Sequence, residues 1–213
     1  MDRLDTVRAA GAADSKQLSD ARRREVLASL RALDGFVAAT RSVSAREISA
    51  RMLAPARASL NALAFEAARG LLADFAAAHE VEEAVVDLIS PAAQYAAYIK
   101  EKLPRLRLRI EAKADARYPI VGAASIVAKV ARDDALGPGR GSGYPSDPAT
   151  QRWLREHLDP VYGFLDREVR FSWETVQRMV REGCRKCVWR SDAEREGRKK
   201  TGALARRGPS PGK

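Results

Sequence analysis

The stretch that decides the fold runs from Glu111 to Asp133 and reads EAKADARYPIVGAASIVAKVARD. A segment that alternates polar and apolar residues, typical of a strand, leads into it, and Asp115 follows. Tyr118 and Pro119 then open a helix whose first turns consist almost entirely of small residues. Open α/β sheets place ligands at the carboxyl ends of their strands, beside closely packed helices. We therefore interpret Asp115 as a site residue, with simple capping of the helix as the alternative.

Composition excludes several classes of protein. The chain has 213 residues, 46% of them hydrophobic, which fits one globular domain with or without a tail. No apolar run reaches the roughly 18 residues of a membrane span, and we expect no secretory signal. Cys184 and Cys187 form one Cys-x-x-Cys without a second pair or a nearby histidine, so a zinc site is not expected. We expect an intracellular, reducing compartment, either nucleus or cytosol.

The formal net charge of +10 is concentrated near the C-terminus. Residues 184–213 hold ten Lys or Arg and three acids, which gives +7 of the total. Together with several glycines and prolines, this composition predicts a basic disordered tail. Such a tail could bind polyanions or act as a nuclear address, and a solvated tail without a dedicated role is the alternative.

Strand and helix patterns alternate along the chain, which predicts an α/β fold with a largely parallel sheet. Three strands are recognisable, at about 36–43, 84–89 and 105–111, and this number is small for such a sheet. Helices are predicted at about 19–30, 44–53, 56–79, 90–102, 119–136, 147–158 and 172–183. The third of these helices carries an apolar stripe that we expect to be buried, formed by Leu60, Leu63, Ala64, Ala67, Leu71 and Phe75.

Asp87 is the most informative single residue, because it lies inside the apolar run from Val85 to Ile89. A carboxylate in such a strand is costly to bury unless it is hydrogen-bonded, paired or bound to a metal. If the two strand ends lie side by side, Asp87 and Asp115 face one crevice, where Mg²⁺ would bridge carboxylates and phosphate oxygens. A surface-facing acid is the alternative for Asp87. Two carboxylates are also fewer than the three or four that a two-metal nuclease site typically needs.

Other candidate residues point to nucleic acid. Tyr144 follows a glycine-rich loop and could stack on a sugar or base, although the Gly-Tyr-Pro sequence is also typical of a plain turn. Lys129 and Arg132 are three residues apart and share one face of the small-residue helix. We expect both histidines, His79 and His157, to be structural or solvated.

Six blocks of sequence occur in order between residues 11 and 182 and together have a recognisable pattern. The blocks are 13–18 (ADSKQL), 86–87 (VD), 113–119 (KADARYP), 123–133 (AASIVAKVARD), 141–148 (GSGYPSDP) and 170–173 (RFSW). In this combination the chain resembles the eukaryotic-type catalytic subunit of type 2 ribonuclease H. More distantly, it is similar to the bacterial and archaeal members of the ribonuclease HII family.

The resemblance implies a three-layer ribonuclease H-like fold with a C-terminal helical region. It also implies an endonuclease that cuts the RNA strand of RNA/DNA hybrids and single ribonucleotides embedded in DNA, with two Mg²⁺ or Mn²⁺ ions held by four acids. Asp87 matches the third of these acids and Asp115 the fourth, so both are implied as catalytic metal ligands. Tyr144 matches the tyrosine that reads the junction between ribose and deoxyribose. The resemblance places further residues near the nucleic-acid groove: Asp14, Ser15, Lys16, Lys129 and Arg132.

The sequence departs from the family pattern at its N-terminus. The family's first strand carries Asp-Glu-Ala-Gly-Arg-Gly, which supplies the first two acids, and this motif is absent here. Asp2 and Asp5 lie in no matching context. We therefore expect the central strand and its neighbour to be missing, through an incomplete gene model or a truncated copy. Two smaller departures are Leu88-Ile89-Ser90 after the third acid and a shortened segment after Asp134.

Three functional hypotheses follow. The first is a ribonuclease H catalytic subunit, which we expect to have little or no activity as this chain alone. In this hypothesis residues 11–136 form the incomplete core, residues 137–183 form its helical extension and residues 184–213 form the tail. The second is a catalytically inactive truncated paralogue that binds nucleic acid or partner subunits. The third is a generic basic nucleic-acid binder that needs only its tail. The expected partners are an RNA/DNA hybrid or ribonucleotide-containing duplex and, in the eukaryotic family, two accessory subunits of a heterotrimer, without a membrane.

Overall fold

The computed structural model describes residues 3–12 and 18–186. In chain order the elements are α1 (Arg3–Ala9), α2 (Asp20–Arg31), α3 (Ala45–Leu53), α4 (Leu60–Ala78), β1 (Glu83–Asp87), α5 (Ala92–Lys102), β2 (Arg107–Glu111), α6 (Ala114–Arg117), α7 (Pro119–Leu136), α8 (Pro148–Glu156) and α9 (Glu174–Gly183). None of the helices in this part of the chain is both long and apolar enough to cross a membrane. The predicted basic tail, apart from residues 184–186, lies outside the described residues.

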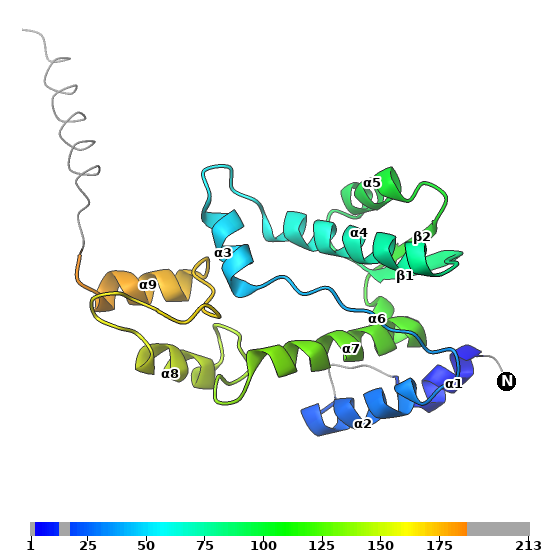
Figure 1. The fold of residues 1–213 in the computed structure, drawn as a ribbon, viewed down its shortest axis with the longest axis horizontal. Helices are drawn as coiled ribbons and strands as arrows, with labels where there is room; N and C mark the ends of the chain where they lie inside the picture. Colours follow the sequence, from blue (N-terminus) through cyan, green and yellow to red (C-terminus); the bar gives the residue numbers. More distant parts are fainter. Residues whose placement is uncertain (1–2, 13–17, 187–213) are drawn as a thin grey trace, which may run out of the picture.

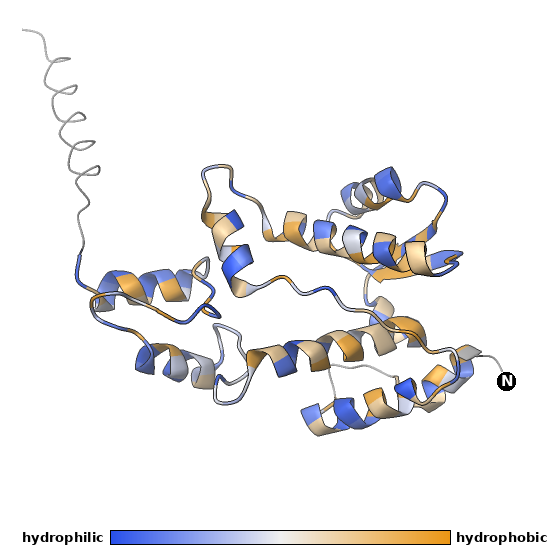
Figure 2. Cartoon of the chain, viewed as in Figure 1, coloured by the Kyte–Doolittle hydropathy of each residue, from blue (hydrophilic) through white to orange (hydrophobic). Residues whose placement is uncertain are grey.

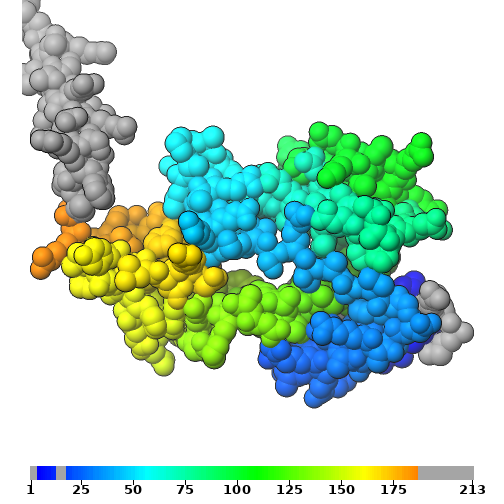
Figure 3. All heavy atoms as spheres, in the orientation of Figure 1, coloured from blue at the N-terminus to red at the C-terminus, as the bar shows by residue number. Residues whose placement is uncertain are grey.

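The elements stack in three layers (Figure 1). Helices α4 and α5 form one outer layer, and α7, with α1 and α2 packed on it, forms the other. The two strands lie between these layers, and the extended segment 36–43 also runs between α4 and α7 (Figures 1 and 3). Apolar residues are frequent on β1 and along α4 and α7 (Figure 2). The arrangement confirms the predicted three-layer α/β fold with a C-terminal helical region.

Strands β1 and β2 pair in parallel, and the register runs from Glu83 opposite Arg107 to Asp87 opposite Glu111. The predicted strands at 84–89 and 105–111 are thus confirmed, with β1 ending at Asp87 and β2 beginning at Arg107. Helix α5 connects them, as a parallel pair requires a crossover. The carboxyl ends of both strands therefore lie at the same edge of the sheet.

The predicted strand at 36–43 is wrong. The segment is extended, but residues 37–43 form no backbone hydrogen bond with another residue of the described chain. Its position is set by side chains instead: Arg41 forms an ion pair with Asp74 of α4 at 2.6 Å and lies against Gly70. A strand exists only where a neighbouring strand completes its ladder, and within the described residues none lies beside this segment.

Local sequence signals set most helix boundaries. The side chains of Ser19, Ser44 and Ser59 each accept a hydrogen bond from a backbone N–H in the first turn of α2, α3 and α4. The last helix, predicted to begin at about residue 172, begins at Glu174 after the N-cap Trp173, while the Ser172 hydroxyl accepts a hydrogen bond from Arg170. Two short helices, α1 and α6, were not predicted, because seven and four residues are too few to show a helical period.

The main apolar cluster lies where α2 packs on α7. Val26, Leu27 and Leu30 of α2 meet Ile126 and Val130 of α7, and all five are buried. A second cluster, formed by Leu154, Phe164, Val169 and Val176, lies within the C-terminal helical region. The first cluster fixes α7, the helix that follows the candidate acid Asp115, against its outer neighbours.

The predicted buried stripe of α4 is wrong in part. Only Leu63 and Phe65 of this long apolar helix are buried, and Phe65 stacks on Tyr95 of α5. Leu60 is 44% exposed, and Leu71 and Phe75 line an open cleft between α4 and α7. One apolar face of α4 is therefore left without a packed partner among the described residues.

Leu30 offers a test of the contact between α2 and α7, because its side chain is fully buried. The Leu30→Ala substitution should lower the free energy of unfolding by about 2–5 kcal/mol, since it removes buried methyl groups and leaves a cavity. Urea denaturation measures this change. Leu53→Ala, at a 51% exposed position of α3, is the control and should cost less than about 1 kcal/mol. Equal losses in the two variants would contradict the packing.

Candidate functional site

Asp87 is the last residue of β1, and its side chain is exposed. Its Oδ1 accepts a hydrogen bond from the backbone N–H of Ala114, at 3.1 Å. Strand pairing continues one step beyond it, because the N–H of Leu88 donates to the carbonyl of Glu111 at 3.0 Å. The carboxylate of Asp87 thus ties the end of β1 to the start of α6.

Asp115 lies in α6 and not at the end of a strand, and it is 6% exposed. Helix α6 packs closely on α7: a Cβ at Gly122 would lie 3.1 Å from the carbonyl oxygens of both Asp115 and Ala12. The small residues of α7 are therefore needed for this close backbone approach. The N-cap of α7 is Tyr118, so Asp115 is not its capping residue.

The structure brings the two predicted acids to the same edge of the sheet. The amide that binds Asp87 belongs to Ala114, the residue next to Asp115. Lys113, with a φ of 57°, makes the left-handed turn that reverses the chain between β2 and α6. The sequence argument that parallel strand ends would join these acids thus agrees with the backbone geometry.

Carboxylate oxygens are suitable ligands for Mg²⁺ or Mn²⁺, but the set here is small. Within residues 3–12 and 18–186, no group of three or more His, Cys, Asp or Glu side chains is placed to hold a metal ion. Asp87 and Asp115 therefore match the chemistry of a divalent-ion site but do not complete one. We derive no catalytic step through a metal from these residues.

Glu111 is a third carboxylate at this edge, and the sequence reasoning missed it. It lies opposite Asp87 in the sheet register. The hydroxyl of Tyr118 donates to one of its oxygens at 2.7 Å, and Arg117 pairs with the other at 3.1 Å. The hydrogen bond from Tyr118 is the main reason why the pKa of Glu111 lies below its usual range. Its position as the last polar residue of an alternating strand was the available signal.

A second group of candidate residues lies at the other end of α7. The ring of Tyr144 is 61% exposed, and the guanidinium of Arg132 lies over it, 4.7 Å from the ring centroid. Arg132 also donates to the carbonyl of Ser142 and pairs with Asp133 at 2.9 Å. Arg132 and Tyr144 thus present one charged and one aromatic group to solvent from adjoining elements.

Asp147 holds the loop that carries Tyr144. Its Oδ2 accepts a hydrogen bond from the N–H of Ser142 at 2.5 Å, and its Oδ1 accepts one from Ala149 at 3.0 Å. The hydroxyl of Thr150 accepts a hydrogen bond from the N–H of Gly143 and donates one to the carbonyl of Arg140. The hydrogen bonds to Asp147, first that from Ser142, hold the pKa of its carboxyl well below the usual range. The sequence predicted the glycine-rich loop and the helix that begins at about residue 147, but not these hydrogen bonds.

The two groups of residues lie well apart on α7. Thirteen residues separate Pro119 from Arg132, which corresponds to about 20 Å along a helix axis. Lys129 lies one turn before Arg132 on the same helix and is half-buried. The helix therefore extends from the acid edge, the edge of the sheet that carries Asp87 and Asp115, to the loop of Tyr144.

The remaining candidates divide into two sets. Both histidines have the structural surroundings expected from sequence: His79 packs on Phe75, and His157 stacks on Trp153 at 4.3 Å between ring centroids. Asp14, Ser15 and Lys16, predicted near the nucleic-acid groove, lie outside the described residues, as does Cys187.

The low pKa of Asp147 predicts a pH dependence. A depressed folded-state pKa contributes stability above the unfolded value, about 3.9 for Asp, and this contribution is lost as pH falls further. Asp147→Asn should therefore lower the melting temperature at pH 7, and the difference from the unmodified protein should shrink below about pH 4. Thermal unfolding followed from pH 7 to pH 3 tests this. Asp34→Asn, in the exposed turn after α2, is the control; a difference for Asp147→Asn that does not depend on pH would contradict the prediction.

Comparison with known proteins identifies the family. The family description Ribonuclease HII matches residues 1–176. A ribonuclease H2 subunit of Bos taurus is 38% identical over 204 residues, covering 89% of this chain and 68% of that protein. The corresponding Homo sapiens subunit is 37% identical over 205 residues, covering 90% and 68%.

Two solved structures are similar in fold. Ribonuclease H2 from Pyrococcus horikoshii OT3 superimposes with a TM-score of 0.67 at 32% identity, covering 84% of this chain and 85% of that one. A chain of the PCNA:RNase HII complex from Archaeoglobus fulgidus gives a TM-score of 0.61, also at 32% identity, covering 72% and 73%. The resemblance stated from sequence is thus confirmed: the chain belongs to the ribonuclease HII family, and within it to the catalytic subunits of type 2 ribonuclease H.

Proposed function

We propose that this chain is the catalytic subunit of an endonuclease that cuts the RNA strand of RNA/DNA hybrids and single ribonucleotides embedded in DNA. The observation that carries the proposal is the hydrogen bond from the N–H of Ala114 to Asp87, because it brings the residue next to Asp115 to the carboxyl edge of a parallel sheet, where Asp87 lies. Membership of the ribonuclease HII family supports the reaction class. We also propose that the protein acts in the nucleus or the cytosol, the compartments expected from its sequence.

Asp87 and Asp115 are proposed to hold divalent ions, Mg²⁺ or Mn²⁺. Two such ions, bound in a complete site, activate a water and stabilise the scissile phosphate in an in-line displacement. The described part of the chain supplies only two acids of the set, so the ions would need further ligands. We therefore expect little or no nuclease activity from this chain alone. A catalytically inactive protein that binds nucleic acid or partner subunits is the second candidate, and the small acid set favours it.

Arg132 and Tyr144 are proposed to contact the nucleic acid. Arg132 supplies a positive charge for a phosphate, and its cation–π contact holds the ring of Tyr144 where a sugar or base can stack. Lys129 adds a second basic side chain on the same helix. Because the relatives are named as one subunit of ribonuclease H2, accessory subunits are proposed as further partners.

The activity proposal is tested with the purified 213-residue chain, Mg²⁺ and a duplex DNA that contains one ribonucleotide. Cleavage should stay at the level of the Asp87→Ala variant, because the acids that residues 3–12 and 18–186 bring together are too few to hold two ions. Ribonuclease H2 from Pyrococcus horikoshii serves as the positive control. Cleavage by the unmodified chain that Asp87→Ala abolishes would overturn the expected inactivity and support Asp87 as a metal ligand.

Binding is tested separately, by fluorescence anisotropy with an RNA/DNA hybrid. Tyr144→Ala should weaken binding by about 1–3 kcal/mol, or roughly 5- to 150-fold, because it removes an exposed stacking surface. Tyr162→Ala is the matched control, since Tyr162 is 76% exposed in the C-terminal helical region, and it should leave affinity unchanged. Equal affinities for the two variants would show that Tyr144 makes no contact with the hybrid.

A further inference from the structure

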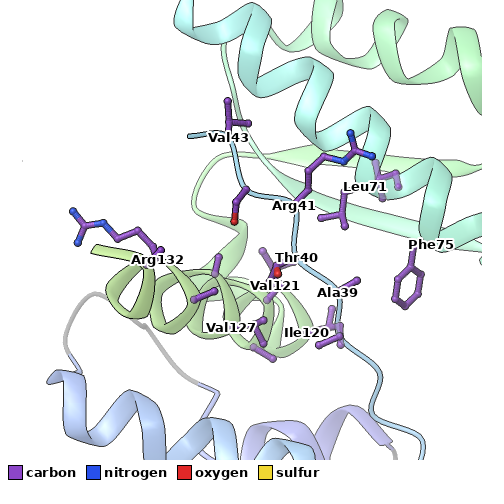
Figure 4. A pocket seen from close by; sticks show the side chains of 18 of the residues that line it. Ala39, Thr40, Arg41, Val43, Leu71, Phe75, Ile120, Val121, Val127 and Arg132 are labelled. Atoms are coloured by element: carbon purple, nitrogen blue, oxygen red, sulfur yellow. The ribbon is translucent and has the colours of Figure 1, made fainter. Parts of the chain in front are cut away.

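The loop between α7 and α8 carries Tyr144, whose ring has little packing of its own and is 61% exposed. The guanidinium of Arg132, which also borders the cleft between α4 and α7 (Figure 4), lies over the ring at 4.7 Å from its centroid. A ring with so few side-chain contacts takes its position from the backbone that carries it. The residues that fix this backbone therefore decide where the ring lies.

Thr150, in the first turn of α8, is a buried polar residue directly behind this loop, and it is 4% exposed. Its Oγ1 accepts a hydrogen bond from the N–H of Gly143 at 2.9 Å. The same hydroxyl donates to the carbonyl of Arg140 at 2.8 Å and lies 3.2 Å from Oδ2 of Asp147. One hydroxyl thus joins two separate points of the loop to α8, with its proton and a lone pair both used.

Gly143, the residue that Thr150 binds, immediately precedes Tyr144 and lies close to α7. Its φ is 67°, in the left-handed region that favours glycine. A Cβ at this position would lie 2.8 Å from Nη2 of Arg132 and 2.8 Å from Cδ2 of Leu136. The backbone at Gly143 is therefore held between the side chain of Arg132 on one helix and the hydroxyl of Thr150 on the other.

We infer that Thr150 is a positioning residue for nucleic-acid binding: its hydroxyl fixes the loop so that the ring of Tyr144 is already placed to stack on an RNA/DNA hybrid. A ring that is ordered before binding loses less conformational freedom on association, so the affinity is higher. The inference rests on the proposed contact between Tyr144 and the hybrid. A packing role would need only the volume of Thr150, whereas positioning needs its hydroxyl.

Three substitutions of Thr150 separate the hydroxyl from the volume, with hybrid binding to the full 213-residue chain followed by fluorescence anisotropy. Thr150→Val keeps the shape and Thr150→Ala does not, but both lack the hydroxyl and should weaken binding at least about fivefold. Thr150→Ser keeps the hydroxyl and should stay within about twofold of the unmodified protein. A packing role predicts a different order, in which Val retains affinity while Ala and Ser lose it.

A double variant tests whether Thr150 acts through Tyr144. When Tyr144 is already alanine, Thr150→Val should cause no further loss of affinity, because the group that the hydroxyl positions is gone. Without nucleic acid, amide hydrogen exchange in residues 142–144 should be faster in Thr150→Val than in the unmodified protein. Thr175→Val, the same change in the first turn of α9, is the control and should leave affinity and this exchange unchanged.

The outcomes distinguish this inference from the proposed function. If Tyr144→Ala weakens binding and Thr150→Val does not, the inference fails while the contact of Tyr144 with the hybrid stands. If Tyr144→Ala has no effect, that contact fails and the inference fails with it. Additive losses in the double variant, or unchanged exchange in residues 142–144, would also overturn the inference. Thr150→Ala and Thr150→Ser decide the question if Thr150→Val does not fold, because only positioning lets Ser retain the affinity that Ala loses.

Discussion

The hydrogen bond from the Ala114 N–H to the Asp87 carboxylate is the contact on which the candidate acid site depends. It can form because β1 and β2 run parallel in a register that places Asp87 opposite Glu111. Lys113 then reverses the chain in a left-handed conformation that costs a lysine roughly 1 kcal/mol relative to an ordinary one. The register, the turn and the carboxylate together position Asp115 beside the end of β1.

Helix α7 connects the acid edge to the rest of the molecule. Gly122 lets its first turns lie against the backbone of Asp115, and the buried contact of its far face with α2 fixes its direction. Its last turns carry Arg132, which contacts both the ring and the loop of Tyr144. Any shift of α7 would therefore affect both the acid edge and the Tyr144 loop.

The sequence predicted features that depend on neighbours in the chain more reliably than features that depend on distant partners. Helix α7 begins at Pro119 and ends at Leu136 as predicted, because a proline start, a helical period and a following glycine are all local signals. The segment 36–43 has strand-like residues, but pairing also requires a second strand, which no local pattern can supply. The apolar stripe on α4 likewise follows from the local sequence, whereas its burial depends on which distant elements pack against it. For the site, the sequence identified Asp87, Asp115 and Tyr144, whereas the hydrogen bonds of Glu111 and Asp147 emerged only from three-dimensional contacts.

The extended segment and the apolar cleft share one physical cause. The two strands in the described part of the chain present too little surface to separate the two helical layers along their full length, so α4 and α7 diverge on either side of this small sheet. Arg41 holds the segment 36–43 to α4 through its ion pair with Asp74. The same strand that borders the cleft ends in Asp87. Order in the middle layer and geometry at the acid edge are therefore coupled through a single five-residue strand.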